Sequence, residues 1–225
     1  MLSSMASPIG EKEKMNRQKE VQTFYNKYPF PNDDSRNHDW ILNALPDVRP
    51  HGEILDVGCG TGEISNFLSQ FGGNVCGIDL SKESIKIAKK RYPEIEFYYD
   101  DITKKTKHNP TFDFIFSIGV LHHIPEIDKA IENIKLCMNR NTYFVVSVYN
   151  KYSTILFKPK LNSNIARTKD WTSHPYRMMY GQKEFKKILE SHGLEVIKIW
   201  RNLPEIVRLL TGRGGMMAYC CRRKI

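Results

Sequence analysis

Three glycines at alternate positions, Gly58, Gly60 and Gly62, form the pattern that best fits a binding site. They follow a short apolar run that contains Asp56. Because glycine has no Cβ, it adopts positive φ angles and lets a ligand lie against the backbone. The pattern predicts a buried strand that ends in a ligand-binding loop. A dinucleotide fingerprint needs glycine where Glu63 stands, and a P-loop needs lysine after the last glycine, so both are disfavoured.

Polar groups also follow the next three apolar runs. One run ends at Asp79, about 20 residues after the glycines, where nucleotide-binding α/β units place an acid on ribose hydroxyls. Two further runs, 95–99 and 112–116, end before Asp101 and before the segment 117–123. Ligands of open parallel sheets bind at the carboxyl ends of the strands, so these groups are expected to share one site.

With these four motifs in this order, the chain resembles the class I S-adenosylmethionine-dependent methyltransferases of the small methyltransferase-domain type. The resemblance is strong over residues 50–150 and looser in the flanks. It implies a Rossmann-like α/β fold, with a seven-stranded, mostly parallel sheet, helices on both faces and one antiparallel strand. It also implies S-adenosylmethionine as the cofactor and no metal ion.

The resemblance assigns cofactor contacts to each motif. The glycine loop would line the methionyl part, and Asp79 would accept both ribose hydroxyls, with Leu80 packed on the adenine. Asp101 would accept a hydrogen bond from the adenine amino group, and the backbone of Ile102 would contact a ring nitrogen. The expected cofactor-binding residues are Asp56, Gly58, Cys59, Gly60, Gly62, Asp79, Leu80, Asp101, Ile102, Ser117 and Gly119.

The hydrophobic periodicity independently predicts alternating strands and helices. Apolar residues after Gly62 recur at helical spacing, Ser81 is a suitable helix cap, and residues 181–192 form a helical stripe that Gly193 ends. Such alternation calls for parallel strands with helices on both faces. We expect an N-terminal helical cap segment over residues 1–49 and a methyltransferase domain over 50–225, with a substrate lid insertion at 150–180.

Composition narrows the class of protein. The five cysteines among 225 residues show neither a disulfide framework nor metal-ligand spacing, which favours a reducing compartment. No signal peptide or membrane span is recognisable, so a cytoplasmic location is expected. The formal charge of +9 could indicate nucleic acid, but the basic residues are scattered. Residues 117–120 also lack the Asn/Asp-Pro-Pro-aromatic motif of amino-group methylases.

Methyl transfer from a sulfonium is an in-line displacement, so positioning alone can contribute about 7–11 kcal/mol. An oxygen acceptor must also lose a proton, and a neutral imidazole is a suitable base. His122 and His123 follow the fourth strand, and His174 lies in the expected lid. The alternative for the adjacent pair is a purely structural role in shaping the loop.

Two regions outside the shared motifs are expected to select the acceptor. Aromatic residues at helical spacing precede a turn at Tyr28-Pro29-Phe30-Pro31, although they could equally pack in the core. The segment 150–180 is long for a connection and mixes basic and aromatic residues, which favours a substrate lid. Its basic residues suggest that the acceptor beneath this lid is acidic. An apolar stretch at 203–211 raises the alternative of a lipid-like acceptor. The candidate substrate residues are Tyr25, Tyr28, Trp171, Tyr176 and Arg177.

The sequence therefore predicts an S-adenosylmethionine-dependent methyltransferase that acts on a small molecule, at oxygen or at carbon, with oxygen favoured. The alternatives are an RNA methyltransferase and a catalytically silent, cofactor-binding regulatory protein. An enclosed apolar pocket would favour a small acceptor, whereas an open basic groove would favour RNA.

Overall fold

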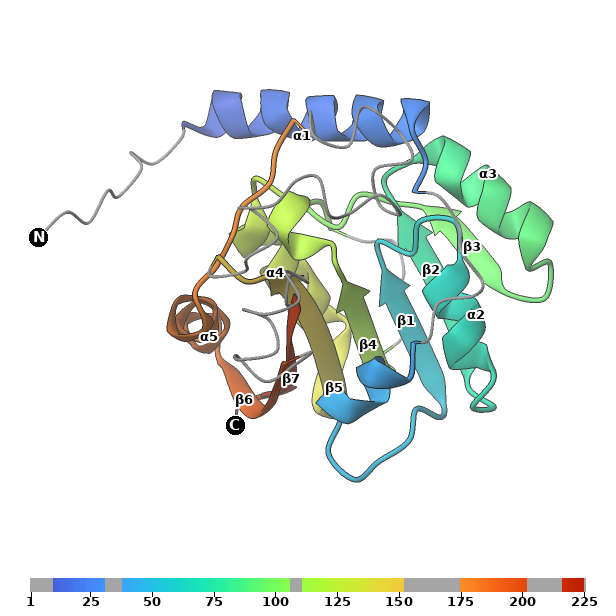
Figure 1. The fold of residues 1–225 in the computed structure, drawn as a ribbon, viewed down its shortest axis with the longest axis vertical. Helices are drawn as coiled ribbons and strands as arrows, with labels where there is room; N and C mark the ends of the chain where they lie inside the picture. Colours follow the sequence, from blue (N-terminus) through green and yellow to red (C-terminus); the bar gives the residue numbers. More distant parts are fainter. Residues whose placement is uncertain (1–9, 31–37, 106–110, 152–174, 202–215, 225) are drawn as a thin grey trace, which may run out of the picture.

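A seven-stranded sheet forms the centre of the molecule, with strand order β3-β2-β1-β4-β5-β7-β6 (Figure 1). This computed structural model describes residues 10–30, 38–105, 111–151, 175–201 and 216–224. Strand β7 runs antiparallel to both of its neighbours, β5 and β6, and the other neighbouring strands pair in parallel. The strands are β1 Glu53–Val57, β2 Asn74–Asp79, β3 Glu96–Tyr99, β4 Phe112–Ile118, β5 Met138–Tyr149, β6 Leu194–Arg201 and β7 Met216–Arg223. The predicted seven-stranded, mostly parallel sheet with one antiparallel strand is confirmed.

Helices cover both faces of this sheet, as the alternating pattern predicted. The buried side chains of α4 and α5 pack on one face, and those of α2 and the 3-10 helix η1 pack on the other. Helix α1 crosses above the arrowheads of β1, β2 and β4, so it covers the edge where those strands end (Figure 1). The helical segments are α1 Glu11–Lys27, η1 Asp39–Ala44, α2 Glu63–Ser69, α3 Lys82–Arg91, η2 Leu121–His123, α4 Ile127–Leu136 and α5 Gln182–Ser191.

Strand side chains alternate between the two cores. In β4, Phe114 and Phe116 face the η1 and α2 side, whereas Ile115 faces α4 and α5. All three are fully buried, because a parallel sheet covered on both faces leaves its central strands no solvent-exposed side. The same alternation in β1 directs Asp56 toward α2, where Ser65 lies.

Strand β5 extends beyond its apolar run. It begins at Met138, whereas the apolar residues of the strand cluster at 143–149. The added residues are mostly polar and pair irregularly, with a register shift between Phe112 and Phe114 of β4. The Thr142 hydroxyl bridges this irregularity by donating to the Phe112 carbonyl over 2.6 Å.

The segment before β1 contributes to two separate parts of the molecule. Its helix α1 lies over the strand ends, whereas η1 packs against β6 and β7 on the sheet face. Trp40 of η1 stacks on Trp200 of β6, with ring centroids 5.3 Å apart. The expected division at residue 49 stays a prediction.

The expected lid at 150–180 is described only at its two ends. Asn150 and Tyr180 pair in an isolated parallel bridge, and residues 152–174 lie outside the described part of the chain. The apolar stretch at 203–211 also lies outside it. Within the described ranges, no helix is both long enough and apolar enough to cross a membrane.

Gly62 offers a test of how tightly the loop after β1 packs. Its φ is +89°, and an added Cβ would lie 2.8 Å from the Tyr92 ring and 2.9 Å from the Phe97 ring. We expect Gly62→Ala to lower the free energy of unfolding by about 2–4 kcal/mol, because backbone strain and overpacking add.

The matched control is Gly193→Ala, since Gly193 has a φ of +71° but no atom within 4 Å of the added Cβ. It should cost only the backbone strain, about 1 kcal/mol in urea unfolding. Equal losses in the two variants would show that contacts with the two rings contribute nothing.

Candidate active site

A cavity of about 510 Å³ lies at the carboxyl ends of β1 to β4, beneath α1. Its wall is formed by residues of α1, of the glycine loop and of the strand ends. These include Gln18, Val21, Gln22, Tyr25, Gly58, Cys59, Gly60, Thr61, Asp79, Leu80, Asp100, Asp101, Ile102, Ile118, Gly119, Val120 and His123. Other segments add Phe30, His38, Trp40, Glu63, Ile64, Tyr149 and Met216. This is the edge at which open parallel sheets bind ligands.

The glycine loop takes the backbone conformation that its sequence requires. Gly58, Gly60 and Gly62 have φ angles of +76°, +54° and +89°, which residues with a Cβ rarely adopt. The backbone N–H groups of Gly58 and Cys59 both donate to the Ile78 carbonyl, over 2.7 and 3.0 Å, which fixes the loop to β2. At Gly60 a Cβ would meet no atom within 4 Å, so this backbone faces open space.

Asp79 holds the loop against the next turn of chain. One carboxylate oxygen accepts from the Gly60 N–H over 2.9 Å, and the other accepts from the Ser81 N–H over 2.7 Å. Burial raises the pKa of Asp79, and these two hydrogen bonds oppose the rise. The carboxylate thus lies on the cavity wall in a fixed orientation, available to hydroxyl donors of a ligand.

Asp56 lies beneath the loop and away from the cavity wall. It is 1% exposed and accepts a 2.6 Å hydrogen bond from the Ser65 hydroxyl of α2. Burial, and then the charge of Asp79, raise its pKa to about 7, while the Ser65 hydrogen bond and the charge of His38 act in the opposite direction. Its position indicates a structural link between β1 and α2.

Two carboxylates follow β3 at one end of the cavity. Asp101 accepts from the Thr103 hydroxyl over 2.7 Å and from the Thr103 N–H over 3.1 Å, and Lys104 lies 3.3 Å away. Asp100 uses Oδ1 to accept from the Asp101 N–H. Its buried Oδ2 has no hydrogen-bond partner within the described part of the chain, so a ligand donor could satisfy it.

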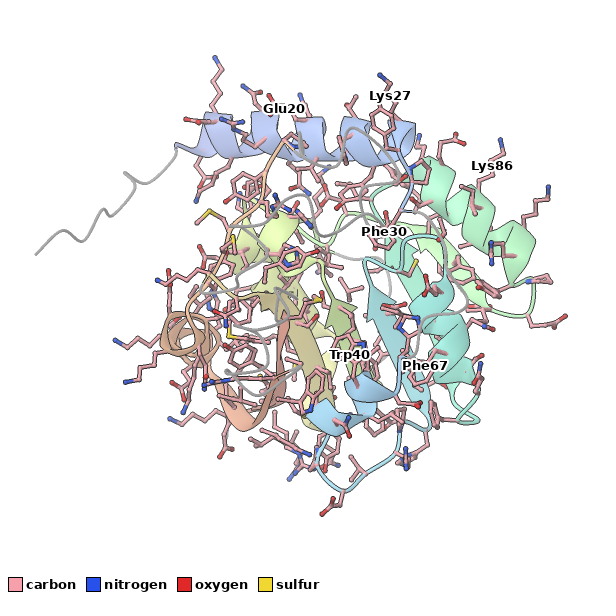
Figure 2. The ribbon with its side chains drawn as sticks, in the orientation of Figure 1. Glu20, Lys27, Phe30, Trp40, Phe67 and Lys86 are labelled. Atoms are coloured by element: carbon pink, nitrogen blue, oxygen red, sulfur yellow. The ribbon has the colours of Figure 1, made fainter. Side chains whose placement is uncertain are left out.

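Helix α1 closes the cavity above these carboxylates. The Gln22 amide donates to the Leu80 carbonyl over 3.2 Å and to the Tyr99 hydroxyl over 2.8 Å. Glu20 and Lys27, on the opposite side of the helix, point away from the sheet (Figure 2). Gln18, four residues before Gln22, therefore shares the inward side and is 9% exposed.

Aromatic and imidazole rings surround the cavity near η2. His123 lines the wall, and its ring centroid lies 6.0 Å from that of Tyr25 and 6.5 Å from that of Tyr149. Its Nδ1 lies 3.0 Å from the Tyr176 carbonyl, which can only accept, so Nδ1 carries the proton. In a neutral imidazole the lone pair then lies on Nε2.

His122 takes a different position from its neighbour. It is fully buried behind the wall, with its ring centroid 4.4 Å from that of Tyr149, and its carbonyl accepts from the Met178 N–H over 2.8 Å. This packing fits the alternative of a residue that shapes the loop.

The structure brings most of the predicted residues to one cavity. Those on the wall are Gly58, Cys59, Gly60, Asp79, Leu80, Asp101, Ile102, Gly119, Tyr25 and His123. Those off the wall are Asp56, Gly62, Ser117, His122, Tyr28, Tyr176 and Arg177. His174 and Trp171 lie outside the described residues.

Most of the residues off the wall have an identifiable local role. Gly62 lies against two rings at the base of the loop, and Tyr28 packs on Phe24 with centroids 5.4 Å apart. Arg177 lies over the Tyr149 ring, 6.0 Å from its centroid, so it contacts a wall residue from outside.

Sequence reasoning missed several wall residues. Gln18 and Gln22 could have been found from their four-residue spacing on a helix, and Asp100 from its position beside Asp101. His38 precedes η1 and contacts Glu63, with Nε2 2.6 Å from Oε1, and no sequence motif marks it.

The raised pKa of Asp56 predicts a specific pH dependence of stability. The folded chain binds one more proton than the unfolded chain between the ordinary pKa of 3.8 and the folded value of about 7. Protonation of Asp56 therefore contributes to stability at low pH, and this contribution is lost as the pH rises from 3.8 to about 7. From pH 5 to 8, wild-type stability should fall by about 2–3 kcal/mol more than that of Asp56→Asn in urea unfolding. Equal changes in the two proteins would contradict the raised pKa.

Comparisons with known proteins identify the family of this chain. The model of the methyltransferase-domain family matches residues 30–199. A ubiquinone biosynthesis O-methyltransferase of Coxiella burnetii is 27% identical over 151 residues, covering 65% of this chain and 64% of that protein. A ubiquinone biosynthesis O-methyltransferase of Colwellia psychrerythraea is 34% identical over 104 residues, covering 44% of this chain and 42% of that protein. The match thus spans just under two thirds of the first relative's length.

Solved structures share the fold at low sequence identity. An S-adenosylmethionine-dependent methyltransferase from Mesorhizobium loti has a TM-score of 0.65 at 18% identity, covering 85% of this chain and all (100%) of that chain. The cyclase SpnF has a TM-score of 0.67 at 15% identity, covering 93% of this chain and 96% of that chain. These likenesses show the fold alone. Because the family model covers most of the chain, the protein belongs to the methyltransferase-domain family.

Proposed function

We propose that this protein transfers a methyl group from S-adenosylmethionine to a hydroxyl oxygen of a small molecule. The cofactor follows from the family to which the chain belongs. The observation that carries the proposal is that one cavity holds both the Asp79 carboxylate beside the glycine loop and the His123 imidazole.

The cavity wall fits the parts of this cofactor. Asp79 would accept the ribose hydroxyls, and the unsatisfied Oδ2 of Asp100, together with Asp101 and Ile102, would meet the adenine. The open space above Gly60 would let the chain toward the sulfur lie on the backbone. When bound, the cofactor supplies a methyl group activated by positive sulfur, so the protein needs no nucleophile of its own.

His123 supports an oxygen acceptor, because removal of a hydroxyl proton needs a base. Its Nδ1 donates to the Tyr176 carbonyl, which orients the ring and leaves the Nε2 lone pair as the proton acceptor. Tyr25 and Tyr149 enclose the imidazole. Proton transfer by a positioned base typically contributes about 10²–10⁴ in rate.

The character of the wall supports a small, largely apolar acceptor. The wall includes Ile118, Tyr149 and Met216, and the Tyr149 ring centroid lies 6.5 Å from that of His123. These side chains suit a ring rather than a charged polymer. The described wall holds no lysine or arginine, which disfavours RNA phosphates inside the cavity. The O-methyltransferase names of the relatives also favour oxygen over carbon. Acidic or lipid-like character of the acceptor stays a prediction, since it depends on segments outside the described residues.

The proposal is tested by incubating the protein with isotope-labelled S-adenosylmethionine and pools of small phenols, acids and lipids. Mass spectrometry should find label on a hydroxyl oxygen of a phenol-like product. Binding of the cofactor without any labelled product would instead favour the silent regulatory protein, and label on RNA would favour the RNA methyltransferase.

Asp79→Ala should weaken cofactor binding by about 100-fold or more, since the variant loses the ribose acceptor and the two hydrogen bonds that hold the loop. Isothermal titration calorimetry measures the affinity, and Asp128→Ala, at an exposed carboxylate of α4, is the control. Unchanged affinity in Asp79→Ala would contradict the assignment.

His123→Ala should lower turnover by about 100-fold or more, while the affinity for the cofactor changes by less than about threefold. A comparison of turnover with calorimetric affinity checks this, and His51→Ala, at an exposed histidine, is the control. His174→Ala is measured alongside, because His174 is the second proposed base. Wild-type turnover in both variants would rule out general-base catalysis by these histidines.

A further inference from the structure

His38 and Glu63 form a polar pair on the cavity wall that the mechanism above does not use. Nε2 of His38 lies 2.6 Å from Oε1 of Glu63, and their side chains are 13% and 11% exposed. Since a carboxylate can only accept, Nε2 carries the proton. His38 comes directly before η1, and Glu63 is the first residue of α2, directly after the glycine loop.

The pair is held in place by the core on the η1 side of the sheet. The His38 ring centroid lies 5.7 Å from that of Phe67 on α2. Trp40 of η1 and Phe67 lie on the same side of the sheet, and both pack against the same buried cluster (Figure 2). A nearly buried pair of this kind contributes little net stability, because desolvation offsets the attraction. Its position therefore calls for an explanation other than stability.

The distribution of charge along the wall gives that explanation. Asp79 ends β2 and Asp100 follows β3, and both mark the nucleoside end, whereas Glu63 lies beyond the glycine loop on α2. Among the described wall residues, the side chains that can carry positive charge are His38 and His123. His123 is the last residue of η2, and its Nδ1 donates to a backbone carbonyl. A ligand carboxylate near the loop would therefore meet His38.

We propose that His38 and Glu63 bind the amino-acid end of the cofactor, with His38 donating to its α-carboxylate and Glu63 accepting from its α-ammonium. In the ligand-free chain the two groups hydrogen-bond to each other. On binding, that hydrogen bond is replaced by one from His38 to the ligand carboxylate and one from the ligand ammonium to Glu63, both of them charge-assisted. This inference rests on the proposed cofactor-dependent function.

Calorimetry with two ligands tests the assignment. S-adenosylhomocysteine, the demethylated cofactor, carries the amino-acid end, and 5′-methylthioadenosine lacks it. His38→Ala and Glu63→Gln should each weaken the affinity for S-adenosylhomocysteine by about tenfold or more. The affinity for 5′-methylthioadenosine should change by less than about twofold. His51→Ala and Glu83→Gln, at exposed positions, are the controls and should change neither affinity.

Two analogues separate the roles of the pair. Decarboxylated S-adenosylmethionine lacks the carboxylate, so wild type should prefer the intact cofactor and His38→Ala should lose that preference. The deaminated analogue of S-adenosylhomocysteine lacks the ammonium, so Glu63→Gln should lose the preference for S-adenosylhomocysteine over it. Each lost preference assigns one ligand group to one residue.

His38→Gln guards against a folding defect, because its amide can still donate to Glu63. It should also weaken S-adenosylhomocysteine more than 5′-methylthioadenosine. Equal losses for both ligands in His38→Gln and Glu63→Gln, or no loss for either, would overturn the assignment. A wild-type protein that binds both ligands but transfers no methyl group would overturn the proposed function and leave the assignment in place. A wild type that binds neither ligand would overturn both.

Discussion

The two hydrogen bonds that Asp79 accepts hold the binding edge of this molecule together. A carboxylate at the end of β2 ties the Gly60 N–H of one loop to the Ser81 N–H of the next. The glycine loop can reach it because positive φ angles turn the backbone N–H inward. The loop after β1 is also fixed to β2 by the Ile78 carbonyl, which accepts from the Gly58 and Cys59 N–H groups.

The sheet sets the position of everything that meets in the cavity. Because β1 to β4 are parallel neighbours, residues far apart in sequence leave the sheet at the same edge. Helix α1 then turns this edge into a cavity, since Gln22 bonds to Leu80 and Tyr99 across the rim. Binding and enclosure thus depend on different parts of the chain.

The sequence allowed the sheet, its helices and several residues of the cavity wall to be predicted, because these depend on local patterns. Glycine spacing, apolar runs and acids at strand ends are readable along the chain, and they led to Gly60 and Asp79. His38 could not be found this way, since its approach to Glu63 depends on how η1 packs on the sheet. The separate positions of His122 and His123 depend on the turn at η2, which periodicity does not specify.

The charge of the cavity is opposite to the charge of the chain. The formal net charge is +9, yet the described wall carries Asp79, Asp100, Asp101 and Glu63 and no lysine or arginine. Carboxylates in a partly dehydrated cavity attract a cation more strongly than they would in water. The sulfonium of the proposed reaction is positive before methyl transfer, and the remaining thioether is neutral, so the same wall would favour the methyl donor over its product. The net charge therefore says little about the ligand, because the basic side chains lie elsewhere than the described wall.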